Sequence, residues 1–503
     1  MIPQTPLNVD NIRATEERFG MKQSEPVMAT FVSLAMLLNY AVLTILLLFA
    51  TPNADSLLSD NSKCACDEAL INRGGFPNGF IFGSASAAYQ ENVQLLKDMG
   101  VDAYKFSISW SRILPGGAIS KGVNRDGIDY YNNLINGLLA NGIQPWSMGD
   151  YAPFGHFTSF GRCLWRLLKF SNCLNEIVYA LNRGDFQDFA DLLFSQIGDR
   201  VKYWITINEP WSLSYLGYTR GVFAPGRCSS FIGNNCVAGD SAIEPYNQLL
   251  AHAAAVKLYR EKYQKVQRGK IGITVKSFWV MDPITFGRYP DSMRTRAGAR
   301  LPEFTKEEAD MVKESFDFVG VNYYSINYAV NIGGHCTNVS YLTDSRTIFT
   351  GEKNGVPIGK QGSTKSWYYI YPKGLRGILR YIKQKYNDPL IYITENGLDE
   401  DNNNSIPMSE AIKDYKRKDY FLDHLCCLRE AIKQDGANVK GFFAWSLTDN
   451  FEWISGYAVR FGLHYVDFTD KSFRRYPKHS AQWFRSILQR KSQKARSTKF
   501  SDQ

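Results

Sequence analysis

The sequence predicts a closed (β/α)8 TIM barrel of the α/β class. Short runs of β-branched and aromatic residues alternate with longer amphipathic stretches, and there are eight such runs. Strands that alternate with helices form parallel β/α units, and eight units close into a barrel. The chain has 503 residues, which allows one large barrel with long loops, and its 44% hydrophobic content excludes disordered, collagen-like and coiled-coil proteins.

The eight predicted strands alternate with helices over most of the chain. They cover residues 80–88, 102–110, 142–148, 201–208, 270–280, 316–325, 389–396 and 439–447. Between them, apolar residues at helical spacing predict amphipathic helices. These helices cover Gly127–Asn141, Asp185–Ile197, Pro245–Tyr263, Pro372–Tyr386, Arg417–Gln434 and Lys478–Gln489.

No linker divides the chain after residue 76, so a single domain is expected there. The predicted divisions are an N-terminal extension with a signal peptide at 1–55, a lead-in at 56–75, the barrel at 76–490 and a basic tail at 491–503. Much of the formal net charge of +9 lies from Lys471 onward. No aromatic stacking module accompanies these basic residues, so we expect a solvated surface and no nucleic-acid partner.

An apolar segment near the N-terminus predicts the destination of the protein. Val27–Ala50 carries no charge and is followed by small residues, as in a cleaved export signal. A retained membrane anchor is the alternative, and a start at Met28 would give a signal of ordinary length. We favour the cleaved signal, which predicts the secretory pathway, an extracellular or vacuolar location, and no membrane partner for the mature chain.

Cysteines and sequons agree with an oxidising compartment. There are nine cysteines, so at least one thiol is unpaired. Cys228 and Cys236 flank a short polar loop and are the best disulfide candidate. Asn338 and Asn403 each begin an N-glycosylation sequon. The sequence has neither the paired histidines of a zinc site nor a nucleotide-binding motif, so no metal and no cofactor are expected.

Two predicted strands end in a glutamate beside an asparagine. Glu209 lies in the segment T-I-N-E-P and Glu395 in I-T-E-N-G. In a (β/α)8 barrel the loops after the strands build the active site. Two carboxylates across the barrel mouth suit glycoside hydrolysis, because one can protonate the leaving oxygen while the other attacks the anomeric carbon. A pair of merely solvated glutamates is the alternative, which the following Pro and Asn-Gly disfavour.

These two segments resemble the acid/base and nucleophile motifs of glycoside hydrolase family 1, in particular of plant β-glucosidases. The resemblance extends from about Phe76 to Arg490. It implies that Glu209 is the general acid/base and Glu395 the nucleophile of a retaining β-glucosidase that acts on small β-glucosides. Myrosinases are otherwise similar but have glutamine at the acid/base position, so Glu209 favours an O-glycosidase.

The resemblance also implies a set of sugar contacts. Asn208 would bind the 2-hydroxyl, and Tyr324 would hydrogen-bond the nucleophile. Trp445 would lie under the sugar ring, and Glu452 with Trp453 would bind the 4- and 6-hydroxyls. A glutamine that binds hydroxyls and a phenylalanine wall complete the set. The matching positions are Gln90, Asn208, Tyr324, Trp445, Glu452, Trp453 and Phe461.

Family loops and termini suggest two disulfides. The segment around Cys228 and Cys236 resembles a typical family loop, which supports their pairing. In related plant enzymes an N-terminal cysteine pairs with one on the seventh helix, which implies that Cys64 or Cys66 pairs with Cys426.

Three stretches depart from the family pattern. Only residues 91–101 separate the first two strands, where the family has a long loop and helix. The third strand lacks the family's H-W-D-x-P segment, and His156 is out of register for its histidine. The fifth strand is followed at once by MDPITFGRYP. Parts of the first, third and fifth β/α units are therefore expected to be missing or irregular. In addition, Lys105 replaces an arginine commonly found beside the nucleophile.

These departures motivate a second hypothesis, a catalytically inactive barrel of the same family that binds sugars or acts as a scaffold. A transglucosidase, which transfers the glucosyl group to another hydroxyl instead of water, is a third. The sequence leaves the aglycone and the oligomeric state open.

Overall fold

The computed structural model describes residues 64, 67–86, 93–150, 183–223, 240–333, 343–363, 369–403 and 405–489. The predictions for the signal peptide and the basic tail therefore concern residues outside the described part. So do those for Gln90, Cys66, His156, Cys228, Cys236 and Asn338.

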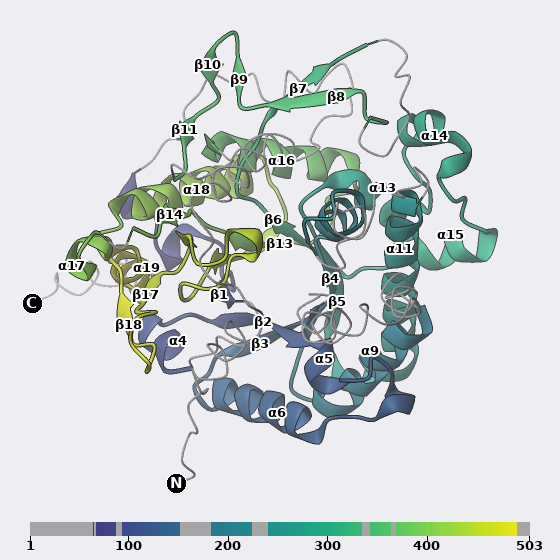
Figure 1. Ribbon diagram of the computed structural model, residues 1–503, viewed down its shortest axis with the longest axis horizontal. Helices are drawn as coiled ribbons and strands as arrows, with labels where there is room; N and C mark the ends of the chain where they lie inside the picture. Colours follow the sequence, from purple (N-terminus) through teal and green to yellow (C-terminus); the bar gives the residue numbers. More distant parts are fainter. Residues whose placement is uncertain are drawn as a thin grey trace, which may run out of the picture.

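Eight parallel strands close into a barrel, as predicted. Their order around the barrel is β1-β15-β13-β6-β5-β4-β3-β2. Figure 1 shows the strands at the centre of the molecule with the helices around them. The strands are β1 (Ile81–Ser86), β2 (Ala103–Ser109), β3 (Gln144–Asp150), β4 (Tyr203–Asn208), β5 (Lys270–Val275), β6 (Phe318–Asn322), β13 (Ile391–Asn396) and β15 (Val439–Trp445).

The outer layer contains all six predicted helices. One of them, α11, begins five residues before the predicted Pro245, which lies inside the helix. The predicted start at Pro245 is therefore wrong, because the helix continues on the N-terminal side of the proline. The main helices are α4 (Val93–Met99), α6 (Arg125–Ala140), α9 (Arg183–Ile197), α11 (Asp240–Leu258), α16 (Pro372–Lys385), α18 (Tyr415–Lys433) and α19 (His479–Gln489).

Shorter elements connect these units. The short helices are α5 (Trp110–Ile113), α10 (Pro210–Ser212), α12 (Lys265–Gln267), α13 (Met281–Phe286), α14 (Asp291–Ala297), α15 (Lys306–Val312) and α17 (Met408–Ala411). The 3-10 and π turns are η1 (Glu68–Leu70), η2 (Arg73–Gly75), η3 (Ile119–Lys121), η4 (Leu213–Thr219), η5 (Tyr259–Gln264), η6 (Phe278–Val280), η7 (Gly298–Arg300) and η8 (Trp453–Ser455). The paired minor strands are β7 (Tyr328–Asn331) with β8 (Thr347–Thr350), β9 (Glu352–Lys353) with β10 (Val356–Pro357), β11 (Lys360–Gln361) with β12 (Tyr369–Ile370), β14 (Glu400–Asp401) with β16 (Val459–Arg460), and β17 (His464–Val466) with β18 (Arg475–Pro477).

The shortened first unit still connects two neighbouring strands. Helix α4 supplies the crossover from β1 to β2, and the two strands pair in parallel from Gly83–Ala103 to Ser86–Phe106. Every residue of β2 is buried, as is every residue of β1 after Ile81. The described part of this crossover contains one helix of seven residues, α4.

The fifth unit is irregular in a different way. The predicted strand extended to residue 280, but β5 ends at Val275 and η6 begins at Phe278. The aromatic and β-branched residues of η6 suggested a strand, yet all three are buried in a helical turn. Helices α13, α14 and α15 then lead to β6. Only Lys276 and Ser277 separate β5 from the helical segment.

Aromatic side chains close the barrel interior at the end where the strands begin. Trp146 is fully buried and stacks on Tyr203, with ring centroids 4.0 Å apart. Phe318, Tyr392 and Phe443 surround it at ring-centroid distances of 4.7–5.6 Å. Removing a buried ring of this kind costs about 3–5 kcal/mol. This end of the barrel interior is therefore filled, and the residues that follow the strands lie at the opposite end.

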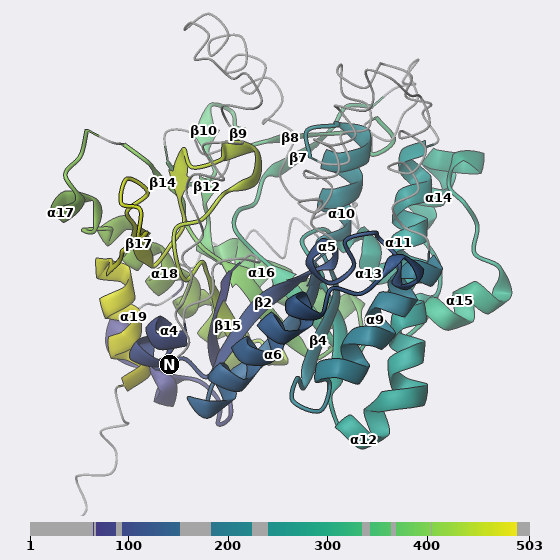
Figure 2. The ribbon, with the colours of Figure 1, turned by 60° about the horizontal axis from the view of Figure 1, so that its bottom comes forward.

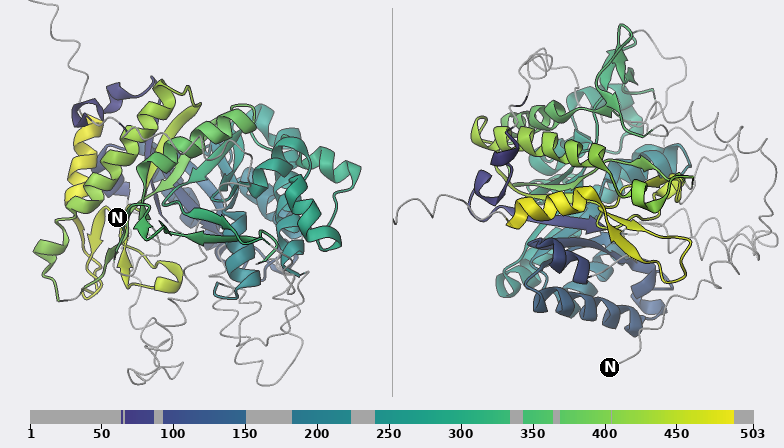
Figure 3. Two further views of the ribbon diagram at one scale, coloured as in Figure 1. Left: turned by 90° about the horizontal axis from the view of Figure 1, so that it is seen from above. Right: turned by 90° about the vertical axis from the view of Figure 1, so that its left-hand side faces the viewer.

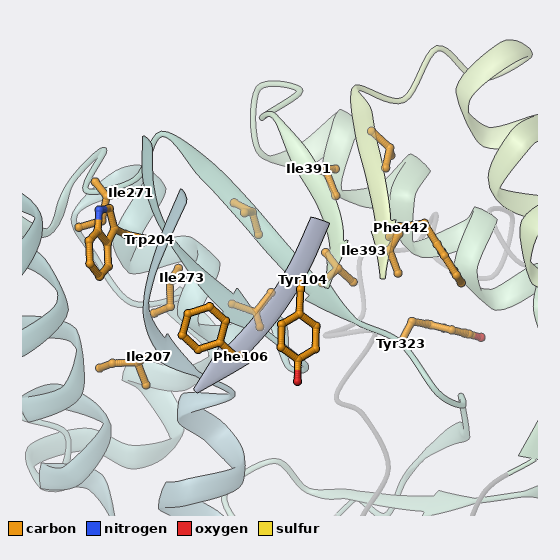
Figure 4. Packing of buried hydrophobic residues seen from close by; sticks show 14 of the residues in the cluster. Tyr104, Phe106, Trp204, Ile207, Ile271, Ile273, Tyr323, Ile391, Ile393 and Phe442 are labelled. Carbon is orange, nitrogen blue, oxygen red and sulfur yellow. The ribbon is translucent and has the colours of Figure 1, made fainter. Parts of the chain in front are cut away.

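A larger apolar layer lies between strands and helices. Figure 4 shows part of it, where Trp204 and Ile207 of β4, Ile271 and Ile273 of β5, and Phe106 of β2 point away from the strands toward the helices. Ile271 and Ile273 alternate along β5, as expected when successive residues point to opposite faces. Trp204 and Ile207 of β4 are three residues apart, because the register of β4 against β5 shifts between Ile205 and Asn208. Side chains on the other face of each strand fill the barrel interior. The polar residues at the strand ends therefore lie at the barrel mouth, the end where the strands finish. In Figure 2, α10, which follows β4, and α12, which precedes β5, lie at opposite ends of the barrel.

The lead-in packs against the last two main helices. In both views of Figure 3 the purple N-terminal segment lies beside α18 and α19. Glu68 forms an ion pair with Lys418 at 2.9 Å and accepts a hydrogen bond from Trp483 at 2.8 Å. A disulfide joins Cys64 to Cys427, with 5.3 Å between their Cα atoms.

The N-terminal disulfide thus differs in part from the expected one. Cys64 pairs with Cys427, the neighbour of the predicted Cys426. Cys426 is also disulfide-bonded. A bond between Cys66 and Cys426 stays a prediction, since Cys66 lies outside the described residues. In the described part of the chain, no helix is long and apolar enough to cross a membrane.

Candidate active site

Glu209 stands directly after β4 in a left-handed backbone conformation, with φ at 51°. The residue before a proline is disfavoured in the right-handed helical region, and Pro210 opens α10. A positive φ is uncommon for a residue other than glycine and often accompanies a functional role. The Glu209 amide donates to the Thr274 carbonyl of β5 at 2.9 Å, which fixes the carboxylate at the barrel mouth.

Glu395 lies near the end of β13 and is only 5% exposed. Its Oε1 is 2.6 Å from the Lys105 ammonium of β2, and its Oε2 accepts a hydrogen bond of 2.7 Å from the Tyr324 hydroxyl. Burial, followed by the charge of Glu395, raises the pKa of Tyr324 well above its usual value of 10. Tyr324 therefore stays a neutral donor, and both oxygens of Glu395 are held in fixed directions.

The two oxygens of Glu209 have different partners. Asn322 of β6 donates to Oε1 at 2.8 Å, and Ser212 of α10 donates to Oε2 at 2.5 Å. The ammonium of Lys276, just after β5, lies 3.8 Å from Oε2. The Glu209 side chain is 12% exposed, so this carboxylate is also largely shielded from water.

Asn208 connects the two carboxylate environments. Its Oδ1 accepts from Asn322 at 3.2 Å and lies 3.4 Å from the ammonium of Lys105. Asn322 is held in turn by Thr394, which donates to its Oδ1 at 2.8 Å. Side chains from β2, β4, β6 and β13 thus form one polar network. The side-chain amide nitrogen of Asn208 is a donor of the kind that can bind a ligand hydroxyl at the mouth.

Flat apolar walls accompany this network. Trp445 ends β15 and forms a small cluster with Ala85 and Tyr324, against which Phe461 packs. The rings of Tyr324 and Phe461 meet edge to face with centroids 6.0 Å apart. The face of a pyranose ring is apolar along its C–H bonds, so a wall of this kind suits a sugar.

Glu452 follows β15 in the same region and is 8% exposed. Burial raises its pKa from 4.5 to about 8, against hydrogen bonds from Asn450 and Trp445, and the charges of Glu395 and Asp399 add to the rise. Among the described residues its buried Oε1 has no hydrogen-bond partner. Buried polar atoms are normally hydrogen-bonded, so this oxygen is suited to a hydrogen bond with a hydroxyl group of a bound ligand. The next residue, Trp453, stacks on Phe223 with centroids 5.1 Å apart.

A buried aspartate supports the loop that carries Glu452. Asp449 is 3% exposed and pairs with Arg460 at 2.6 Å and Lys478 at 2.8 Å. It also accepts hydrogen bonds from the amides of Gly462 and Val466. Satisfied buried networks of this kind fix one arrangement of the chain.

The structure joins Asn208, Glu209, Glu395 and Tyr324 in one polar network. Trp445 and Phe461 pack on Tyr324, and Glu452 lies within reach of the charge of Glu395. The printed ring contact of Trp453 is with Phe223, so its place at the sugar stays a prediction, as do the roles of the other residues.

The structure adds Ser212, Lys276 and Asp449, which the sequence interpretation did not assign. Lys276 shares the signal that identified the glutamates, a polar residue directly after an apolar strand, and could have been found. Ser212 and Asp449 carry no such signal, because their roles depend on neighbours distant in sequence. Asn403 is exposed in the loop after β14, as a glycosylation site requires, and its modification stays a prediction.

Comparisons with known proteins place this chain in a family. The family described as "Glycosyl hydrolase family 1" matches residues 89–281 and 274–493, and the two stretches overlap at 274–281, in the irregular fifth unit. Beta-glucosidase 12 of Oryza sativa subsp. indica is 44% identical over 505 residues, covering 86% of this chain and 96% of the relative. Beta-glucosidase 13 of Arabidopsis thaliana is 45% identical over 449 residues, covering 82% and 84%.

Solved structures similar to this chain are β-glucosidases as well. The crystal structure of the rice Os3BGlu6 β-glucosidase has a TM-score of 0.75 at 38% identity, covering 83% of this chain and 100% of that one. A family 1 β-glucosidase from Thermotoga maritima has a TM-score of 0.66 at 30% identity, covering 82% and 97%. With the barrel, the family match and relatives of this identity and coverage, the chain belongs to glycosyl hydrolase family 1 and is a glycosidase.

Proposed function

We propose that the protein hydrolyses terminal non-reducing β-D-glucosyl residues from β-glucosides with retention of configuration. The observation that carries this proposal is the pair of strand-end glutamates, each held by its own donors. The β-glucosidases among its relatives support glucose as the glycone. Retaining glycosidases use two carboxylates in this way, one as nucleophile and one as acid/base.

In the first step Glu209 donates its proton to the glycosidic oxygen while a Glu395 oxygen attacks the anomeric carbon. The C–O bond to the aglycone breaks, the aglycone leaves as an alcohol, and a glucosyl ester forms on Glu395. In the second step Glu209, now a carboxylate, takes a proton from water, and the resulting hydroxyl attacks the anomeric carbon. Glu395 leaves as a carboxylate, which restores the enzyme.

The surrounding residues orient the reactants. Lys105 and Tyr324 hold the oxygens of Glu395 along the line of attack. Asn208 binds the 2-hydroxyl, a contact that strengthens as positive charge develops on the ring. Trp445 lies under the sugar, and Glu452 with Trp453 takes the 4- and 6-hydroxyls. Gln90 and Phe461 complete the glucose subsite in this proposal.

The second hypothesis was a catalytically inactive barrel, and its basis was the departure of the first, third and fifth β/α units from the family pattern. The described site keeps both glutamates with a full set of donors, and the first and fifth units still connect their strands. Hydrolysis is therefore the function that the geometry supports better. Transfer to a second hydroxyl would use the same residues and differs only in the acceptor.

The proposed location is the secretory pathway, with an extracellular or vacuolar destination. The disulfide between Cys64 and Cys427 supports it, since stable disulfides form in oxidising compartments. The small β-glucoside is the proposed partner.

Proton NMR in D2O tests the stereochemistry of the reaction. With an aryl β-glucoside as substrate, β-glucose appears first and α-glucose only later, as mutarotation proceeds. Release of α-glucose as the first product would contradict the double displacement.

A further inference from the structure

One buried carboxylate holds several parts of the loops after β15. Asp449 is buried, and each of its oxygens has two donors. Oδ2 lies 2.6 Å from the Arg460 guanidinium and accepts from the Val466 amide at 3.2 Å. Oδ1 lies 2.8 Å from the Lys478 ammonium and accepts from the Gly462 amide at 3.0 Å. Because these bonds are buried and two of the donors are charged, the carboxylate is fixed in one direction.

Two of these donors are the chain neighbours of Phe461. Arg460 precedes Phe461 and donates through its side chain, and Gly462 follows it and donates through its amide. The Phe461 ring packs on the small cluster that contains Trp445, the proposed platform under the sugar ring. Asp449 therefore holds the residues on both sides of a ring that walls the proposed glucose subsite.

Asp449 also holds the segment that leads to Glu452. The Asp449 amide donates to the His464 carbonyl at 3.0 Å. The next residue, Asn450, hydrogen-bonds the Glu452 side chain, and the Glu452 amide donates to the Gly456 carbonyl at 2.8 Å. Glu452 follows Asp449 by only three residues, so a shift of Asp449 would move the Glu452 carboxyl group.

The two segments that Asp449 joins are in direct backbone contact. A Cβ atom added to Gly462 would lie 2.0 Å from the Asp449 amide nitrogen, so only glycine allows this approach. The two cations, Arg460 and Lys478, are buried like the carboxylate. Neutralising Asp449 would leave both buried cations without this counter-ion, so the loops would shift to solvate them.

We propose that Asp449 is a positioning residue that determines the specificity for the glycone. It fixes Phe461 and Glu452 in the one arrangement that recognises the 6-hydroxyl of glucose, and it contacts no part of the substrate itself. This inference rests on the proposed glucosidase function and on the sugar contacts proposed for these two residues. A carboxylate that only stabilised the fold would affect the turnover of every glycoside to the same extent.

The test compares 4-nitrophenyl β-D-glucoside with 4-nitrophenyl β-D-xyloside, which has the same aglycone but no 6-hydroxyl. The ratio of their kcat/KM values does not depend on how much of a preparation is folded, so a loss of stability alone leaves the ratio unchanged. We expect Asp449→Asn to lower the glucoside-to-xyloside ratio about 3- to 10-fold, the range of one weakened hydrogen bond.

Asp317→Asn is the matched control and should leave the ratio unchanged. Asp317 also pairs with an arginine, Arg260 at 2.8 Å, and accepts from an amide, that of Ile271 at 3.0 Å, but it lies where β6 begins, at the opposite end of the barrel from the mouth. An unchanged ratio in Asp449→Asn, or equal wild-type kcat/KM values for the two glycosides, overturns the inference while turnover of the glucoside upholds the proposed function. If wild type hydrolyses neither glycoside nor any other aryl β-glucoside, the proposed function itself is wrong.

A second variant, Gly462→Ala, disturbs the same contact without removing a charge, in case Asp449→Asn does not fold. The added methyl group would push Asp449 away from the segment that carries Phe461, so the glucoside-to-xyloside ratio should fall here as well. A wild-type ratio in folded Gly462→Ala contradicts the inference. If neither variant yields folded protein, the contact is required for folding itself, and the assignment of Asp449 to specificity is overturned.

Discussion

At the scale of single residues, the two glutamates differ in what surrounds them. Glu395 is 5% exposed, with a lysine and a tyrosine on its oxygens, which suits a group that must attack along one direction. Glu209 has an amide and a hydroxyl on its oxygens and a more distant cation. These are the different environments that two carboxylates with different roles require.

The proposed acid/base role of Glu209 predicts a dependence on the leaving group. In this proposal Glu209→Gln removes the proton donor, which contributes typically about 10²–10⁴-fold to such a reaction. We expect a loss of this size in kcat/KM for an alkyl β-glucoside. For 2,4-dinitrophenyl β-glucoside, whose leaving group needs no protonation, the loss in kcat/KM should be small.

Added azide gives an independent readout of the same variant. Azide needs no general base, so it should accelerate the turnover of 2,4-dinitrophenyl β-glucoside by Glu209→Gln and produce β-glucosyl azide. Equal losses on both glucosides, with no effect of azide, would contradict the acid/base assignment.

At the scale of elements, the strands and helices were largely predictable because their patterns are local. All eight strands form near their predicted places, and polar residues at their ends were the basis for predicting the candidate site. The predictions of strands and helices were wrong where tertiary packing outweighs the local sequence pattern. Phe278–Val280 has the composition of a strand but turns into the helical layer, and α11 continues on the N-terminal side of Pro245.

Helix α11 carries a buried carboxyl group that makes a prediction about stability. Glu244 is 5% exposed, and burial raises its pKa from 4.5 to about 8, against a hydrogen bond from Tyr218. Between about pH 4.5 and pH 8 the folded protein therefore keeps a proton that the unfolded chain loses. Folding takes up this proton, so Glu244 reduces stability progressively as the pH rises through that interval.

The glutamine of Glu244→Gln does not titrate, so the variant lacks this loss of stability. The melting temperature of Glu244→Gln minus that of wild type should therefore increase from pH 5 to pH 8. Differential scanning calorimetry at several pH values measures this difference, and other titrating groups cancel. Glu261→Gln is the control, because that side chain is 65% exposed and should give a constant difference. A constant difference for Glu244→Gln as well would show that this carboxyl group does not keep its proton.

At the scale of the whole molecule, the chain closes a barrel although its first unit is shortened and its fifth is irregular. In the described residues the first crossover contains a helix of only seven residues, α4, and α13 follows soon after β5. The sequence predicted the closed barrel from the number of strands. It could not predict that Lys276 would approach Glu209, because that contact requires the pairing of β4 with β5 and the two-residue connection after β5.

The central claim is that this barrel is a retaining glycosidase with Glu395 as the nucleophile. Its most direct test is incubation of the purified full chain with 2,4-dinitrophenyl 2-deoxy-2-fluoro-β-D-glucoside, followed by intact mass spectrometry and peptide mapping. The fluorine slows breakdown of the covalent intermediate, so we predict loss of activity and one fluoroglucosyl group on the peptide containing Glu395, with none in Glu395→Gln. A folded protein that acquires no label, or that carries it on another residue, would contradict the account.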